Sequence, residues 1–295
     1  MIVMGSHTPL AIRLLLPALL AACFDPAGSG VDGPAENVLF AERVLNIAHR
    51  GGKRLAPEAT LPAYASAVEL GVDVLEIDLR ATADGVLVCL HDRTVDRTTD
   101  GEGAVDELTL AALRGLDAGY HFSPDGGATH PYRGQGVTVP TFAEVLDAFP
   151  GYHFSVEIKQ TEPSIVDLFL AEVGARGVQD RIVLESISDA ALREVRARDP
   201  AVHTALGLAE LTEFLLLIDD TTIADYTPPA RFLHPPWDAV GAAELDRARQ
   251  VGLKTHVWTV NQRDDMELLV DLGVDGIMTD DPALLAEVLA GRAAR

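Results

Sequence analysis

The sequence predicts an α/β protein of the TIM (β/α)8 barrel class, with a small capping insertion after the third strand run. Short β-rich runs alternate with helical stretches from Val44 onward, and no long linker interrupts them. Such alternation gives a parallel sheet covered by helices. About eight units in roughly 250 residues fit a closed barrel better than an open doubly wound sheet. No glycine-rich dinucleotide motif follows the first strand, which also argues against a Rossmann fold.

The expected strands are short apolar runs bounded by turn-forming residues. They are Leu45–Ala48, Val74–Leu79, Val86–Leu90, His153–Ile158, Arg181–Leu184, Val202–Leu206, Arg231–Leu233, Thr255–Thr259 and Gly276–Met278. Several intervening helices have a capping residue or proline at their start and glycine at their end. The predicted starts are Thr60 (with Pro62), Pro163, Ser188 and Pro282, and the predicted stops are Gly71 and Gly174 or Gly177.

Two segments need separate expectations. Residues 93–138 are rich in Gly, Asp and Thr and do not follow the alternation, so we expect an insertion lying over one end of the barrel. The apolar run Phe214–Ile218 is expected to be a core helix, and the alternative is a membrane-facing patch. The barrel as a whole is expected to occupy residues 44–295.

The N-terminal segment has the layout of a secretory signal. One early cation, Arg13, precedes a short apolar stretch that ends at Ala22 and is too short to span a bilayer as a helix. Its end, Leu20-Ala21-Ala22-Cys23, resembles the lipobox of bacterial lipoproteins, in which the cysteine is acylated and becomes the mature N-terminus. An ordinary signal peptide is the alternative. We therefore expect a signal peptide over 1–22, a flexible tether over 23–43, and an exported lipoprotein anchored to a membrane of the cell envelope.

Charge and cysteine content narrow the functional classes. The chain has 23 Lys and Arg against 45 Asp and Glu, a formal net charge of −22. This surface repels polyanions, so nucleic acid is not an expected partner, and any bound phosphate needs a local cationic site. The second cysteine, Cys89, lies in an apolar run and is expected to be a buried strand residue. With Cys23 acylated, no intrachain disulfide is expected.

Acidic side chains gather where the predicted strands end, which is where TIM barrels carry their chemistry. Glu76 and Asp78 are two residues apart on one strand, so they face the same side. Two such carboxylates facing inward do not both ionise without a cation between them. Glu157, from a nearby strand, can supply a third oxygen ligand. All-oxygen donors favour Mg²⁺ or Ca²⁺ over zinc.

Basic side chains and histidines follow the same strand ends. Lys159 has the same facing as Glu157 and can hold a phosphate oxygen, and Arg50 offers a fork that matches phosphate oxygens. His49 and His91 end strands on the same rim, where two histidines can act as general acid and base across a phosphorus. The loop after the first strand also carries Glu58, to which we assign a supporting role.

Several of these residues belong to motifs that resemble the glycerophosphodiester phosphodiesterase family. The motifs appear in the family's order and cover roughly Asn46 to Leu289. They are His49-Arg50-Gly51 with Ala56-Pro57-Glu58, Glu76-Ile77-Asp78, Thr82 with Asp84-Gly85-Val86, His91-Asp92, Arg97-Thr98-Thr99, Val139-Pro140-Thr141-Phe142, Val156-Glu157-Ile158-Lys159, Val257-Trp258-Thr259-Val260-Asn261 and Gly273-Val274-Asp275-Gly276-Ile277.

The resemblance implies a TIM barrel that hydrolyses glycerophosphodiesters to glycerol phosphate and an alcohol. It implies one divalent metal on Glu76, Asp78 and Glu157, an acid/base pair of His49 and His91, and Arg50 and Lys159 near the phosphate. It also implies attack by the neighbouring glycerol hydroxyl, which gives a transient cyclic phosphate that water then opens.

Two positions depart from the family pattern, and two others border the expected site. Ala59 stands where the family usually has asparagine, which puts the metal shell or the loop in question. Ile187 stands where phenylalanine is frequent, and we expect this to alter packing only. Trp258 can stack on the glycerol or head group or pack at the rim, and the His234–Trp237 segment can border the mouth.

Two other functions remain open from the sequence. One is a phospholipase D-like or phosphatidylinositol-specific lipase on a related barrel, for which the lipid anchor would give access to the bilayer. The other is a catalytically inactive binding lipoprotein, which the change at Ala59 allows and the paired histidines and carboxylates oppose.

Overall fold

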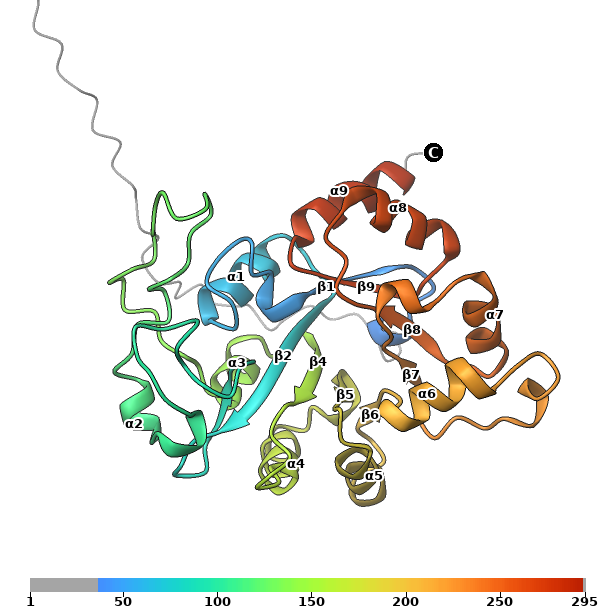
Figure 1. Cartoon of the computed structure of the whole chain (residues 1–295), viewed down its shortest axis with the longest axis horizontal. Helices are drawn as coiled ribbons and strands as arrows, with labels where there is room; N and C mark the ends of the chain where they lie inside the picture. The colour runs from blue at the N-terminus through green and yellow to red at the C-terminus, as the bar shows by residue number, and fades with distance from the viewer. Residues whose placement is uncertain (1–36, 294–295) are drawn as a thin grey trace, which may run out of the picture. The chain divides into compact units, whose positions relative to one another are not determined.

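The computed structural model describes residues 37–293, and eight parallel strands form a ring in that part of the chain (Figure 1). The ring order is β6-β5-β4-β2-β1-β9-β8-β7, and a parallel bridge between Ala205 and Phe232 joins its two ends. The TIM barrel prediction is confirmed. The strands are β1 (Leu45–Ala48), β2 (Val74–Ala81), β4 (His153–Ile158), β5 (Ile182–Glu185), β6 (His203–Thr204), β7 (Phe232–Leu233), β8 (Lys254–Val257) and β9 (Gly276–Thr279).

Helices surround this ring, as Figure 1 shows. They are α1 (Leu61–Glu69), α3 (Phe142–Ala148), α4 (Val166–Arg176), α5 (Asp189–Arg198), α6 (Leu208–Leu217), α7 (Ala242–Gln250), α8 (Arg263–Leu272) and α9 (Pro282–Ala293). The short helix α2 (Leu110–Leu113) belongs to the insertion. None of the helices in the described residues is long and apolar enough to cross a membrane.

Local sequence signals account for most helix ends. The Thr60 hydroxyl accepts from the amide of Ala63, and the Ser188 hydroxyl caps α5 in the same way. Gly177 ends α4 with a φ of 60°, a conformation that glycine adopts without strain. The start of α4 differs from the prediction: turn residues follow Pro163, and the helix begins only at Val166.

The third predicted strand run is not part of the barrel. β3 (Leu87–Cys89) pairs antiparallel with the end of β2, with Cys89 opposite Leu79, and Cys89 is buried as expected. The insertion that follows has an apolar cluster of its own, which includes Val95, Val105 and Leu113. Its outer loops extend to the side of the ring in Figure 1, and its first residues approach the mouth of the barrel.

Two expectations about apolar segments need correction. Residues 38–41, assigned to the tether, belong to the barrel: Leu39 is 1% exposed, and the ring of Phe40 meets that of His203 edge-on at 5.0 Å. Burial of these apolar side chains against the barrel strands stabilises the segment. In α6, Phe214 is buried, but Leu216 and Leu217 are 75% and 69% exposed, since an amphipathic helix buries only one stripe. The signal segment and Cys23 lie outside the described residues.

Candidate active site

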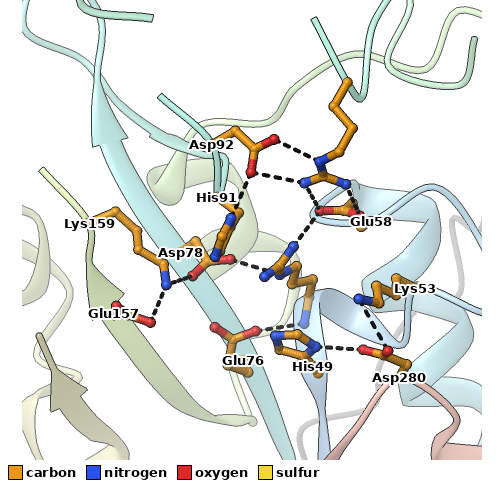
Figure 2. Close-up of polar contacts among 12 residues, drawn as sticks. His49, Lys53, Glu58, Glu76, Asp78, His91, Asp92, Glu157, Lys159 and Asp280 are labelled. Atoms are coloured by element: carbon orange, nitrogen blue, oxygen red, sulfur yellow. Dashed lines mark hydrogen bonds and ion pairs between the residues drawn. The ribbon is translucent and has the colours of Figure 1, made fainter. Parts of the chain in front are cut away.

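The pocket at the carboxyl ends of the strands brings together most of the residues predicted to carry function. It has a volume of about 340 Å³, and Asp78 lies buried beside the residues that line it. The predicted residues that line the pocket are His49, Arg50, Glu76, His91, Glu157, Lys159 and Trp258. Figure 2 shows the polar contacts among the charged members of this group.

A tight turn after β1 places His49 and Arg50 at the pocket. Arg50 has a left-handed backbone with a φ of 52°, which turns its amide onto Glu76 at 2.6 Å. Gly51 follows with a φ of 78°, and a Cβ there would lie 2.9 Å from the backbone nitrogen of Tyr64. Glycine is therefore required by both its backbone conformation and the close approach of α1.

The two histidines share one arrangement. His49 Nδ1 lies 2.6 Å from Asp280 Oδ1, and His91 Nδ1 lies 2.7 Å from Asp92 Oδ1. A carboxylate at Nδ1 fixes the orientation of each ring and leaves Nε2 as the nitrogen free for chemistry. Burial lowers the pKa of His91, although the hydrogen bond to Asp92 acts in the opposite direction.

Arg50 is held by two carboxylates. Its Nη1 donates to Glu58 at 2.9 Å, and its Nε lies 3.2 Å from Asp78 Oδ2. Glu58 also accepts from Arg97 at 2.7 and 2.8 Å, and Arg97 donates to Asp92 at 2.7 Å. Burial opposes ionisation of Glu58, but Arg97 and then Arg50 hold its pKa down at about 2. Glu58 supports the site by accepting hydrogen bonds from both arginines, which orients Arg50 and holds Arg97 beside it.

The carboxylates of β2 and β4 surround Lys159. The Lys159 ammonium lies 2.5 Å from Glu157 and 3.3 Å from Asp78, so Lys159 and Glu157 do face the same way. Burial raises the pKa of Glu157 to about 7, with repulsion from Glu185 adding to the effect. The pKa of Glu76 is raised well above its ordinary value by burial and then by Asp78 and Glu185. This region carries more negative charge than its two cations balance.

The three candidate metal ligands, Glu76, Asp78 and Glu157, are chemically suited to a hard divalent cation. Between Asn37 and Ala293, no three Asp, Glu, His or Cys side chains are already grouped as a metal site, because Arg50 and Lys159 lie among the carboxylates. All three candidate ligands nevertheless offer oxygen atoms, as Mg²⁺ and Ca²⁺ prefer. Asp78 Oδ2 is also buried without a hydrogen bond. The charge excess and this oxygen, which faces Arg50 Nε without a hydrogen bond, make Glu76, Asp78 and Glu157 suitable ligands.

The two departures from the family pattern now have structural explanations. Ala59 is buried with a φ of 56°, a conformation that asparagine adopts more readily than alanine, so the change lies in the loop backbone next to Glu58. The packing expectation for Ile187 is wrong. It is 67% exposed and lines the pocket, so the change alters the surface of the site and not the core.

Several site residues were missed by sequence reasoning. Asp280 follows β9 and Glu185 ends β5, so the rule that barrel chemistry lies at strand ends could have indicated both. Asp92 and Arg97 lay within quoted motifs but had no assigned role. Of the His234–Trp237 segment, His234 does line the pocket.

The comparisons with known proteins agree with this geometry. Residues 49–284 match the sequence profile described as the Glycerophosphoryl diester phosphodiesterase family. The chain belongs to this family. A glycerophosphodiester phosphodiesterase of Caldanaerobacter subterraneus subsp. tengcongensis is 33% identical over 256 residues, which cover 84% of this chain and 98% of that protein. The predicted enzyme class, a phosphoric diester hydrolase, is confirmed by these family matches.

Solved structures of family members show the same barrel. The crystal structure of glycerophosphodiester phosphodiesterase from Agrobacterium tumefaciens has a TM-score of 0.70 and 26% identity, covering 85% of this chain and 100% of that one. A phosphodiesterase from Oleispira antarctica, solved with the product sn-glycerol-3-phosphate, has a TM-score of 0.69 and 25% identity. The match covers 84% of this chain and 96% of the Oleispira antarctica chain.

Proposed function

We propose that this chain hydrolyses glycerophosphodiesters to glycerol phosphate and an alcohol, with His49 and His91 as its acid/base pair. The observation that carries the proposal is the matched arrangement of the two imidazoles. Each has its Nδ1 on a carboxylate, and both line one pocket with Arg50 and Lys159. Figure 2 shows His49 with its partner Asp280 and His91 with its partner Asp92.

The proposed roles follow from charge and position. Arg50 and Lys159 bind the phosphate oxygens, because they are the cations of the pocket. One histidine accepts the proton of the attacking hydroxyl as its oxygen bonds to phosphorus. The other donates a proton to the leaving alcohol as the bond between phosphorus and that alcohol breaks, which leaves a cyclic phosphate. Water then attacks the phosphorus with the two histidines in exchanged roles, and the ring opens to give glycerol phosphate. Glu76, Asp78 and Glu157 would hold Mg²⁺ or Ca²⁺, which supplies positive charge to the phosphate when bound.

The test is a substrate panel measured with and without a chelator. It contains glycerophosphocholine, glycerophosphoethanolamine and glycerophosphoglycerol, together with a lysophospholipid. We expect turnover of the water-soluble diesters and its loss in excess chelator. The lysophospholipid is included because Ile187 and Leu208 expose apolar surface at the mouth. Turnover of the lysophospholipid alone would favour the lipase alternative, and no turnover of any diester would favour a binding protein.

We also propose that the chain is an exported lipoprotein attached to a bacterial membrane through Cys23. The support is the lipobox-like sequence Leu20-Ala21-Ala22-Cys23 after a short apolar stretch. The proposed anchor is independent of the catalytic proposal, and its test is given in the Discussion.

A further inference from the structure

The half of the pocket contributed by β5 to β8 contains a connected group of three side chains that the proposed mechanism does not use. His234 Nδ1 lies 3.2 Å from Glu185 Oε2, and the Trp258 indole donates to the His234 carbonyl at 2.8 Å. Ser155 donates to the other oxygen of Glu185 at 3.0 Å. His234 thus fixes a carboxylate through its side chain and an aromatic ring through its backbone.

Among residues 37–293, no lysine or arginine forms an ion pair with Glu185, whose partner is His234. His234 is 5% exposed, and its Nε2 has no hydrogen-bond partner. The contact of Nδ1 with Glu185 Oε2 fixes the position of this carboxylate, which lines the pocket.

The charges of the whole pocket lead to the same conclusion. Glu76, Glu157 and Glu185 line it together with the cations Arg50 and Lys159, and Asp78 lies beside them. When Glu76, Asp78 and Glu157 hold a divalent ion, Arg50 and Lys159 are free to bind the phosphodiester anion of the substrate. Glu185, which has no lysine or arginine partner of its own in the described residues, then favours a substrate with a positive group on this side.

The remaining walls of this half suit a bulky cation with little hydrogen-bonding capacity. The Trp258 side chain is held by its indole N–H and is 39% exposed at the pocket. Most of the other walls are apolar (Ile187, Leu206, Leu208 and Leu211), and Ser186 and Thr259 add two hydroxyls, of which that of Ser186 donates to the Ile158 carbonyl. An aromatic face, a nearby carboxylate and aliphatic walls together are the surroundings that bind quaternary ammonium groups. Few donors are available here for the hydroxyls of a polyol.

We propose that Glu185 and Trp258, positioned by His234, bind the trimethylammonium group of a choline-type alcohol in the substrate. This inference rests on the proposed function, because it assigns the head group of the same diester. It makes glycerophosphocholine the preferred substrate class, and it makes Glu185 and Trp258 specificity residues. Neither residue is assigned to the bond-breaking step.

The experiment compares two substrates that differ only in charge. These are glycerophosphocholine and its 3,3-dimethylbutyl analogue, in which carbon replaces the ammonium nitrogen. We expect the wild-type enzyme to prefer the charged substrate about 10-fold in kcat/KM, the scale of a desolvated cation over an indole. Glu185→Gln, which keeps the shape and removes the charge, should reduce this ratio to about 3-fold, the part left to the indole, by raising KM for the charged substrate.

The controls keep the two proposals separable. Glu69→Gln changes an exposed glutamate at the far end of α1 and should leave the ratio unchanged. Trp258→Leu tests the aromatic face separately if Glu185→Gln unfolds, and thermal melting checks the fold of each variant. Choline added as a competitor should inhibit the wild type more strongly than Glu185→Gln.

Three outcomes would overturn the inference. Equal kcat/KM for both substrates would show that the ammonium is not recognised. A ratio unchanged by Glu185→Gln and by Trp258→Leu would place its recognition elsewhere. Faster turnover of glycerophosphoglycerol than of either substrate would show that the subsite takes a polyol. Failure to cleave any diester would contradict the proposed function itself and is distinct from these results.

Discussion

His49 Nδ1 and Asp280 Oδ1 lie 2.6 Å apart, a contact that joins the ends of the first and last strands of the barrel. Asp280 is itself held in place: it accepts from Asn261 at 2.8 Å, and the Lys53 ammonium lies 3.2 Å away. Burial opposes ionisation of Asp280, but His49 and then Lys53 hold its pKa at about 2. The carboxylate is therefore charged at neutral pH and can stabilise His49 when that ring takes up a proton.

Replacing Asp280 with asparagine should slow catalysis without preventing substrate binding. We expect Asp280→Asn to lower kcat by about 10²-fold and to change KM little, because the imidazolium loses its counter-charge and the ring can turn. Steady-state kinetics over a range of pH measures both effects. Asp281→Asn is the matched control, since Asp281 caps α9 and asparagine also serves as a cap. A wild-type rate in Asp280→Asn would refute the assigned role.

Removing either histidine should cost about 10²- to 10⁴-fold in rate, the usual scale of general acid–base catalysis. The double variant should be scarcely slower than the single ones, because groups that act as a unit are not additive. A substrate with a better leaving group should partly rescue the variant that lost the acid, which identifies the acid. A substrate without the adjacent hydroxyl should be cleaved very slowly. Near-normal rates for both single variants would exclude the two-histidine mechanism.

Glu58 should make the free energy of unfolding fall as the pH is lowered into the acid range. Its pKa is about 2 in the folded protein, below the ordinary value of 4.5. The stabilisation is therefore fully present above about pH 5 and is lost as the pH falls through the folded pKa. Glu58→Gln should flatten the fall in unfolding free energy between about pH 5 and pH 2, as measured by denaturant titration. Glu69→Gln should keep the wild-type slope, and equal slopes for Glu58→Gln would contradict the assignment.

A divalent ion should stabilise the folded chain. The carboxylates Glu76, Asp78 and Glu157 repel one another, so MgCl₂ or CaCl₂ at about 100-fold excess over Kd should raise Tm by about 5 to 10 °C. The ion with the larger shift is the preferred metal. Glu76→Gln should remove the shift, while Glu69→Gln should retain it. The metal proposal fails if neither salt changes the Tm of the wild type.

The lipid anchor is tested by partitioning. Expressed in a bacterium, the wild-type protein should enter the detergent phase, because an acyl chain adds about 0.8 kcal/mol per buried methylene. Cys23→Ser should stay in the aqueous phase, and Cys89→Ser serves as the matched control because Cys89 is buried in β3. Identical partitioning of the wild type and Cys23→Ser would leave no support for an anchor.

Much of the fold could be predicted because its signals are local. Apolar runs such as Val74–Leu79 and caps such as Thr60 and Ser188 depend on neighbours in the sequence, and each appears in the structure close to its predicted bounds. The site followed from one rule of the fold, since strand ends that are far apart in sequence meet on one rim. His49 and Lys159 reach one pocket in this way.

The rest depends on side-chain packing between distant segments. Asp280 lies 231 residues from His49, and only the register between β1 and β9 brings them into contact. Arg97 lies in an insertion with no periodicity from which its direction could be read. Leu216 and Leu217 continue an apolar run, but their exposure depends on which side of α6 meets the barrel.

Arg97 gives the insertion a larger part in the enzyme than its position beside the barrel suggests. It connects the partner of His91 to the partner of Arg50, yet it belongs to a segment with a separate apolar cluster. A small cluster can open locally while the main body stays folded. Heat or denaturant should then inactivate the protein before the barrel melts, so that lost turnover reports the detachment of one subdomain and not global denaturation.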